Sequence, residues 1–198
     1  MRIVGGRFRG ARLAAPGAEG GGGAHLRPTS DRVREALFNL LAHGDYPPIE
    51  GARVLDLFAG TGALGLEALS RGAARAVFVD DPGKARALIR ENVGRLGLEG
   101  ETKIWRREAT RLGPCRGTSF DLVFLDPPYR SGLAARALDS AQEGGWIAPG
   151  AVVVLELAAD EAAPESGWLD LADRRRYGDT QILILRAAGK GRQTEDTP

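Results

Sequence analysis

The architecture of this chain follows from the segment Asp56-Leu57-Phe58-Ala59-Gly60-Thr61-Gly62. The segment joins the apolar run 53–57, which is typical of a buried strand, to a helical pattern over about 63–71 that stops at Gly72. A glycine-rich loop in this position lies at the carboxyl end of its strand, where open α/β sheets bind ligands. The segment therefore predicts an α/β fold and a ligand site.

Strand and helix patterns alternate along the rest of the chain. Further helices are predicted from Pro82 to Leu96 and around 134–142, and the apolar strands between helices indicate a parallel sheet covered on both faces. The predicted strands after the first are 76–79, 103–105, 122–125, 152–157, 168–176 and 181–186. The last two flank a turn at 177–180 and predict a hairpin at the far edge of the sheet.

The segment before residue 53 has a different pattern. Residues 2–5 and 10–13 predict a hairpin too small to be stable without docking on something larger. Thr29 or Ser30 can cap a helix whose apolar positions run from Val33 to Leu41 on one face. We expect an N-terminal hairpin arm at 1–28, a main domain at 29–188 and a polar, disordered tail at 189–198.

Composition excludes several classes of protein. The 198 residues and 21.0 kDa suit one domain with a small appendage. No apolar run approaches the roughly 18 residues that span a bilayer, and no apolar signal stretch follows Met1, so we expect a cytoplasmic protein. With one cysteine and two histidines, a disulfide scaffold, a zinc finger and a Cys/His nucleophile pair lack their ligands, and we expect no metal.

The charge distribution is uneven although the formal net charge is only +1. The first 34 residues hold seven arginines against Glu19 and Asp31, which is typical of a nucleic-acid-binding arm. An arginine-rich composition caused by a GC-rich genome explains the same bias equally well. The predicted RNA-binding residues are Arg2, Arg7, Arg9, Arg12, Arg27, Arg32 and Arg34.

The glycine loop favours a cationic ligand. Residues 60–65 formally match the G-x-G-x-x-G pattern of dinucleotide sites, but there the first glycine directly follows the strand. Here Asp56 intervenes, and a carboxylate repels a pyrophosphate but attracts the ammonium and sulfonium groups of S-adenosylmethionine. The alternative is a tight turn without a ligand.

Two further sites extend the predicted cofactor pocket. Asp80 ends the second strand, where an acid can bind a ribose diol, and Asp81 is a first-turn acid or helix cap beside it. Glu108 and Ala109 follow the third strand, where such sheets meet an adenine edge, although a plain surface charge fits nearly as well. The predicted cofactor residues are Asp56, Phe58, Ala59, Gly60, Thr61, Gly62, Asp80, Asp81, Glu108 and Ala109.

The most specific string is Asp126-Pro127-Pro128-Tyr129, directly after a buried strand. Two prolines end strand pairing and fix the backbone rigidly. A nucleobase amine is a poor nucleophile, because its lone pair is delocalised into the ring. The Asp126 carboxylate and the Pro127 carbonyl can accept its two N–H bonds and orient the nitrogen for methyl transfer, while Tyr129 stacks on the base. The predicted catalytic residues are Asp126, Pro127, Pro128 and Tyr129.

These strings together resemble the class I S-adenosylmethionine-dependent methyltransferases, and more closely the bacterial 16S rRNA guanine-N2 methyltransferases known as RsmD. The resemblance runs over almost the whole chain, and the matching strings are 1–6 with Arg9-Gly10, 27–39, 56–72, 120–129 and 176–180. The resemblance implies a Rossmann-like fold with a seven-stranded, mostly parallel sheet, an antiparallel last strand and an N-terminal hairpin arm. It also implies S-adenosylmethionine as methyl donor and 16S rRNA, naked or in a partly assembled small subunit, as substrate.

Two alternatives remain open at this point. The Asp-Pro-Pro-Tyr string is shared with DNA adenine-N6 and cytosine-N4 methyltransferases, but about 50 N-terminal residues leave little room for a DNA-recognition domain. A non-catalytic rRNA-binding assembly factor could use the same fold, although the intact Asp126–Tyr129 string argues against it. We expect the enzyme to act as a monomer.

Overall fold

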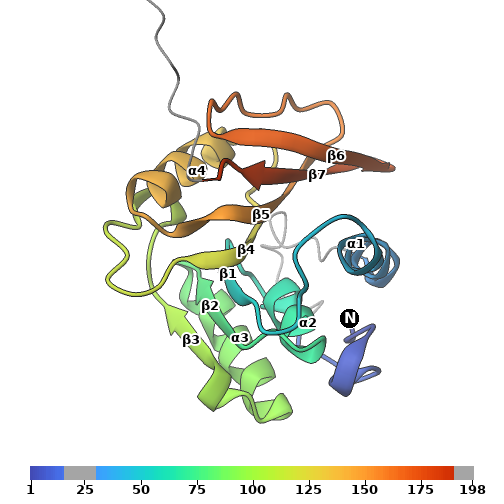
Figure 1. Ribbon diagram of the computed structural model, residues 1–198. Helices are drawn as coiled ribbons and strands as arrows, with labels where there is room; N and C mark the ends of the chain where they lie inside the picture. The colour runs from blue at the N-terminus through green and yellow to red at the C-terminus, as the bar shows by residue number, and fades with distance from the viewer. Residues whose placement is uncertain (16–29, 190–198) are drawn as a thin grey trace, which may run out of the picture.

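A seven-stranded sheet forms the centre of the computed structural model, which describes residues 1–15 and 30–189 (Figure 1). The strand order is β3-β2-β1-β4-β5-β7-β6. The strands are β1 (Arg53–Leu57), β2 (Arg75–Val79), β3 (Thr102–Trp105), β4 (Phe120–Leu125), β5 (Ile147–Ala158), β6 (Leu169–Tyr177) and β7 (Thr180–Ala187). Each overlaps a predicted strand, and β5 is longer than expected because it begins at Ile147.

Strands β1 to β5 run parallel, and only β7 runs against its neighbours β5 and β6. The predicted parallel sheet with an antiparallel last strand and a terminal hairpin is therefore confirmed. The carboxyl ends of β1, β2 and β4 meet at one edge of the sheet, which brings the glycine loop and the Asp126–Tyr129 loop together.

Helices cover both faces of the sheet. The helices are α1 (Asp31–His43), α2 (Ala63–Ser70), α3 (Gly83–Leu96) and α4 (Leu133–Glu143). Buried residues of α1, α2 and α3 pack against one face through Val54, Phe78 and Phe124, while α4 packs against the other through Leu55 and Val123. No helix within residues 1–15 and 30–189 is long and apolar enough to span a bilayer.

The predicted start of α1 is confirmed, and the predicted start of α3 is shifted by one residue. Ser30 caps α1, because its hydroxyl accepts a hydrogen bond from the Val33 N–H at 3.3 Å. Pro82 is the N-cap residue of α3 rather than its first helical residue, and Asp81 does not cap that helix. The predictions that fall on Arg27 and Thr29, together with the predicted tail from residue 190 onward, lie outside the described residues.

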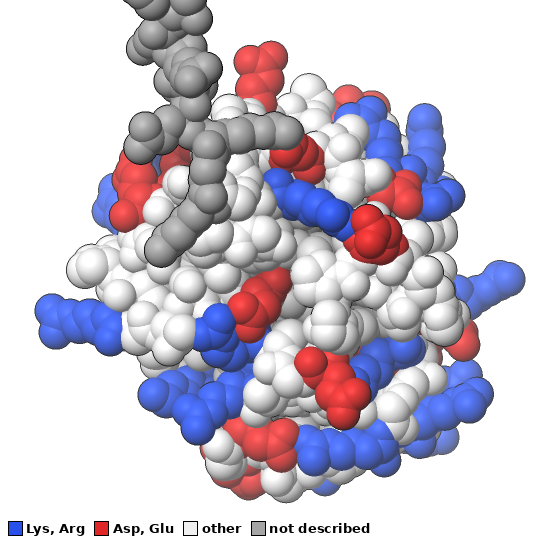
Figure 2. Space-filling model, viewed as in Figure 1, with Lys and Arg blue, Asp and Glu red and all other residues white. Residues whose placement is uncertain are grey.

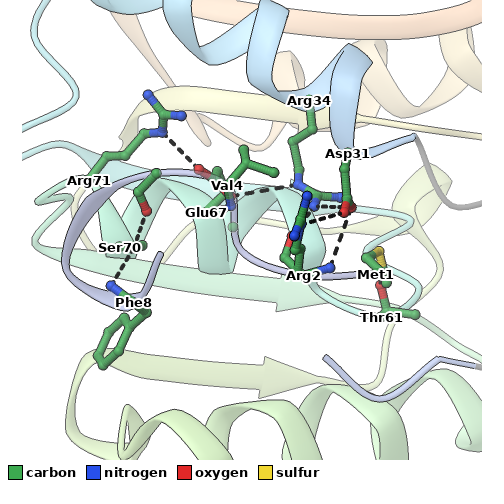
Figure 3. Close-up of polar contacts among 12 residues, drawn as sticks. Met1, Arg2, Val4, Phe8, Asp31, Arg34, Thr61, Glu67, Ser70 and Arg71 are labelled. Carbon is green, nitrogen blue, oxygen red and sulfur yellow. Dashed lines mark hydrogen bonds and ion pairs between the residues drawn. The ribbon is translucent and has the colours of Figure 1, made fainter. Parts of the chain in front are cut away.

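The N-terminal arm docks on α2 (Figure 3). Arg2 and Arg12 form one antiparallel bridge, and three backbone hydrogen bonds join Met1 and Ile3 to the segment 10–13 around the short helix η1 (Gly6–Phe8). The two predicted segments therefore lie side by side, but neither forms a regular strand. The hydroxyl of Ser70 accepts from the Phe8 N–H at 3.0 Å and donates to the Gly5 carbonyl at 2.6 Å. Gly6 has φ +72°, and a Cβ there would lie 1.9 Å from the Ser70 carbonyl oxygen, so only glycine allows this close approach.

A buried ion-pair network fixes the arm and α1 to α2 (Figure 3). Glu67 is fully buried and accepts from the Val4 N–H at 2.8 Å and from Arg71 Nε at 2.8 Å. Arg34 is also fully buried, 3.6 Å from Glu67, and donates to Asp31 and to the carbonyl of Arg2. The prediction that Arg34 binds RNA is therefore wrong, because its guanidinium is enclosed by protein.

Replacing Glu67 with alanine should destabilise the fold by about 3 to 5 kcal/mol, because it leaves the buried Arg34 guanidinium short of a counter-charge. Urea denaturation followed by circular dichroism measures this change. The matched control is Glu91→Ala, which breaks the exposed Glu91–Arg95 pair on α3 and should cost about 0.5 kcal/mol or less. Equal losses in the two variants would contradict the structural role of the network.

Candidate active site

The glycine loop is closed by two acidic side chains. Asp56, near the end of β1, accepts a hydrogen bond from the Gly65 N–H in α2 at 2.9 Å. Asp80, directly after β2, accepts from the Gly60 N–H at 2.7 Å. Phe58 between them has φ +59°, a left-handed conformation that a residue with a side chain rarely adopts and that is typical of functional loops. The two predicted acids therefore hold the loop in a fixed, strained shape.

The charge of this loop determines the ligand that it can accept. Asp56 is only 2% exposed, and burial together with the nearby Asp80 raises the pKa of Asp56 to about 8. Burial also raises the pKa of Asp80. Ionising Asp56 and Asp80 in this buried position costs free energy unless a positive charge lies nearby. The two acids therefore favour a cationic ligand and disfavour a pyrophosphate.

Gly65 illustrates how tightly the loop is packed. A Cβ at this position would lie 2.4 Å from the ring of Phe78 and 3.1 Å from the Asp56 carboxylate. Any larger residue would displace either the buried ring or the carboxylate that accepts from the Gly65 N–H.

The arm reaches the same loop. The side chain of Asn92, buried in α3, donates to the Thr61 carbonyl at 2.9 Å and to the Ala14 carbonyl at 3.1 Å. It also accepts from the Ala14 N–H at 2.6 Å. Met1 Sδ lies 3.9 Å from the Thr61 hydroxyl (Figure 3). The arm and the loop are therefore held by one shared side chain.

The outer predicted cofactor residues lie at the rim of this edge. Asp81 is exposed, with its carboxylate 3.4 Å from Arg106 Nε, and Glu108 is exposed, 3.7 Å from Arg111 Nε. Ala109 is buried at the start of the short helix η3 (Ala109–Arg111). Cofactor contacts of these three residues stay predictions.

The Asp126–Tyr129 loop lies beside the glycine loop. The Asp126 N–H donates to the Leu57 carbonyl at 3.4 Å, which joins the ends of β4 and β1. Burial, together with the negative charges of Glu156 and Asp56, raises the pKa of Asp126 well above its ordinary value. The negative charges of three acids, in β1, directly after β4 and in β5, therefore influence one another at this edge of the sheet.

Sequence reasoning missed two residues that hold Tyr129. The Tyr129 hydroxyl donates to Glu156 Oε1 at 2.9 Å and lies 2.7 Å from the Thr180 hydroxyl. Burial and the Glu156 charge raise the pKa of Tyr129 to about 12, so the hydroxyl keeps its proton. Two features of the sequence could have indicated these residues. Glu156 is a single acid inside the apolar run 152–157, and Thr180 is a threonine at the turn 177–180.

The remaining predicted RNA-binding arginines differ in their pairing. Arg2 pairs with Asp31 at 3.3 Å and Arg7 with Glu101, while Arg9, Arg12 and Arg32 are exposed without an ion pair in the described part of the chain. Figure 2 shows basic and acidic side chains interleaved on the viewed face rather than gathered in one basic patch. Part of the positive charge in the first 34 residues therefore stabilises the fold.

The sheet order, the glycine loop closed by two acids and the Asp-Pro-Pro-Tyr loop after β4 together define a class I methyltransferase. The chain belongs to the family described as Conserved hypothetical protein 95, whose family model matches residues 1–186. This result confirms the resemblance to the RsmD family.

Curated relatives and solved structures agree with this assignment. The chain is 41% identical to Ribosomal RNA small subunit methyltransferase D of Escherichia coli (strain K12), over 99% of this chain and 94% of the relative. It is 34% identical to Putative rRNA methyltransferase YlbH of Bacillus subtilis (strain 168), over 96% and 100%. The structure of the putative methyltransferase yhhF from Escherichia coli superposes with a TM-score of 0.82 at 32% identity, covering 96% of this chain and 99% of that one.

The raised pKa of Asp56 predicts a pH dependence of stability. Because the folded-state pKa of about 8 exceeds the ordinary 3.8, the contribution of Asp56 to stability is fully present below pH 3.8 and is lost as pH rises from there to about 8. Asp56→Asn removes this contribution and should make the decline shallower. Urea titrations of the ligand-free protein at several pH values measure the slope. Glu91→Gln, at an exposed position, is the control, and an unchanged slope in Asp56→Asn would contradict the account.

Proposed function

We propose that the chain transfers a methyl group from S-adenosylmethionine to the exocyclic N2 amine of a guanine in 16S rRNA, in the cytoplasm. The observation that carries the proposal is the hydrogen-bonded junction of the Asp126–Tyr129 loop and the glycine loop at the ends of β4 and β1. The junction supports the proposal because it brings the acidic glycine loop next to the two oxygens that we assign as acceptors for the amine. The names of the curated relatives, which are rRNA methyltransferases of the small subunit, support the substrate class.

The residues present fit the cofactor. The Asp80 carboxylate suits a ribose diol, and the negative potential of Asp56 and Asp80 suits the ammonium and sulfonium groups. When bound, S-adenosylmethionine supplies an electrophilic methyl group that leaves with the bond electrons remaining on sulfur. We propose no metal, because the sulfonium already activates the methyl group.

The protein's own part is to orient the amine. In this proposal the Asp126 carboxylate and the Pro127 carbonyl accept the two N–H bonds of guanine N2, which directs the nitrogen lone pair toward the methyl group. As the N–C bond forms, the nitrogen becomes positive, and the Asp126 carboxylate stabilises that charge and is positioned to accept the departing proton. Tyr129 stacks on the base, its ring fixed by the two partners of its hydroxyl.

Calorimetry with S-adenosylhomocysteine and transfer of a labelled methyl group to small-subunit rRNA test the proposal together. We expect tight binding of S-adenosylhomocysteine, no binding of NAD, and labelled guanine rather than adenine or cytosine in the RNA. Methylation of a DNA duplex instead would favour the DNA amino-methyltransferase alternative.

Asp126→Ala should lower the single-turnover methylation rate by about 100-fold or more while changing RNA affinity little, because Asp126 acts in the transition state. Tyr129→Ala should lower the rate and weaken RNA binding by about tenfold, the value of one stacked base. Rapid-quench assays and filter binding measure the two effects. A near-normal rate in Asp126→Ala would overturn the proposed chemistry.

The exposed arginines should contribute to RNA affinity through phosphate contacts. Replacing Arg9, Arg12 or Arg32 with alanine should each reduce the slope of log affinity against log salt by about 0.7, as expected for one phosphate contact to single-stranded RNA. Affinity for S-adenosylhomocysteine should not change. Arg136→Ala, on α4 at the other face of the sheet, is the control, and equal slopes in all variants would show that Arg9, Arg12 and Arg32 make no phosphate contacts.

A further inference from the structure

A pocket lies at the opposite edge of the sheet from the candidate active site, where β1, β2, β3 and β4 begin. Its volume is about 310 Å³. The connections from β1 to β2, from β2 to β3 and from β4 to β5 each contain an α-helix, whereas the connection from β3 to β4 contains only the short helix η3. The face of β2 and β3 on the α4 side is therefore left partly uncovered, and the pocket lies on it.

Three positively charged side chains line this pocket. Arg53 and Arg75 are opposite each other at the first residues of β1 and β2, and Lys103 in β3 is opposite Val77. Because side chains alternate between the two faces of a strand, the three cations lie on the same face of the sheet. Asp121 neutralises Arg53, since it accepts two hydrogen bonds from the guanidinium at 2.9 and 2.7 Å.

The other two cations are not neutralised by the fold. Arg75 and Lys103 are exposed and form no ion pair within residues 1–15 and 30–189. Glu101 is the acid that lines the pocket, and it pairs with Arg7 of the N-terminal arm. The pocket therefore presents a positive charge that an anionic ligand can neutralise.

The same pocket has an aromatic surface. Phe120 stacks on Trp146 with ring centroids 6.0 Å apart, and Trp105 meets Trp146 edge-on at 5.3 Å. These contacts hold the Trp105 ring in place while it stays partly exposed. A fixed aromatic side chain beside unneutralised cations is the arrangement with which proteins bind an unpaired nucleotide, because the base packs on the ring and the phosphate contacts the cations.

We propose that this pocket binds an unpaired nucleotide of the substrate RNA, with its base against Trp105 and its phosphate at Arg75 and Lys103. The inference rests on the proposed function only in taking rRNA as the partner. A five-residue strand such as β2 is about 17 Å long, and a small RNA-binding domain can contact roughly 16 base pairs of RNA. One folded RNA can therefore reach both this pocket and the Asp126–Tyr129 loop.

Cys115 lines the pocket and is the only cysteine of the chain, so its thiol reports directly on occupancy. Alkylation by N-ethylmaleimide is followed by mass spectrometry, with and without an unmodified 16S rRNA transcript whose binding is measured on filters. At a transcript concentration about ten times the dissociation constant, alkylation should slow by about tenfold, since only unbound protein reacts. S-adenosylhomocysteine, which we assign to the other edge of the sheet, should give no protection.

An unchanged alkylation rate in the presence of bound RNA would overturn the inference and leave the proposed function intact. Equal protection by adenosine monophosphate at the same concentration would also overturn it, because the pocket would then be a site for a free nucleotide. A transcript that neither binds nor is methylated would overturn the proposed function and the inference with it.

The double variant Arg75→Ala/Lys103→Ala should reduce the slope of log affinity against log salt by about 1.4, the value for two phosphate contacts to single-stranded RNA. The matched control is Arg90→Ala/Arg136→Ala, which removes two exposed arginines from α3 and α4 and should leave the slope unchanged.

Gly117→Leu fills the pocket without removing a charge. A Cβ at this exposed position meets no atom within 4 Å, so the fold accommodates the substitution. It should weaken RNA binding by about fivefold or more, the value of one stacked base, and leave the affinity for S-adenosylhomocysteine unchanged. Equal slopes in the two double variants, or wild-type RNA affinity in Gly117→Leu, would overturn the inference.

Discussion

The desolvation of carboxylates at one edge of the sheet is the constraint on which the site depends. Asp56 and Glu156 are almost completely buried, and the pKa of Asp126 between them is raised by burial and by both neighbours. Removing ionised acids from water is costly unless hydrogen-bond donors or a cation compensate. The backbone N–H groups of Gly65 and Gly60 compensate Asp56 and Asp80 in part. We propose that the positive charge of the cofactor compensates them further. The desolvation penalty of these acids in the ligand-free protein therefore favours ligands that carry positive charge.

The N-terminal arm, α1, α2 and α3 hold the glycine loop in place through buried polar contacts. Glu67 joins the arm, α1 and α2 through Val4 and Arg34, and Asn92 joins the arm to the carbonyl of Thr61 in the glycine loop. Each link is a buried polar contact between segments far apart in the sequence, so each fixes tertiary geometry more than it adds stability. The arm is consequently part of the support of the cofactor loop as well as a carrier of exposed arginines.

The sequence predicted the features whose signals are local. Apolar runs and glycines predicted the order of strands and helices, and acids at or directly after strand ends indicated the loops of Asp56, Asp80 and Asp126. What it missed depends on contacts across long separations. Arg34 was assigned to RNA because its partner Glu67 is 33 residues away in another helix, and Glu156 looked like one polar residue in an apolar strand. Neither burial nor partnership can be read from a single segment of chain.

We propose that this chain installs a methyl group on guanine N2 in small-subunit rRNA. The decisive measurement is mass spectrometry of nucleosides from 16S rRNA, compared between cells that contain the chain and cells that lack it. We expect one N2-methylguanosine to disappear without the chain and to return when the wild-type gene is restored, but not when the Asp126→Ala gene is supplied. An unchanged level of N2-methylguanosine, or the loss of a methylated adenine or cytosine in its place, would contradict it.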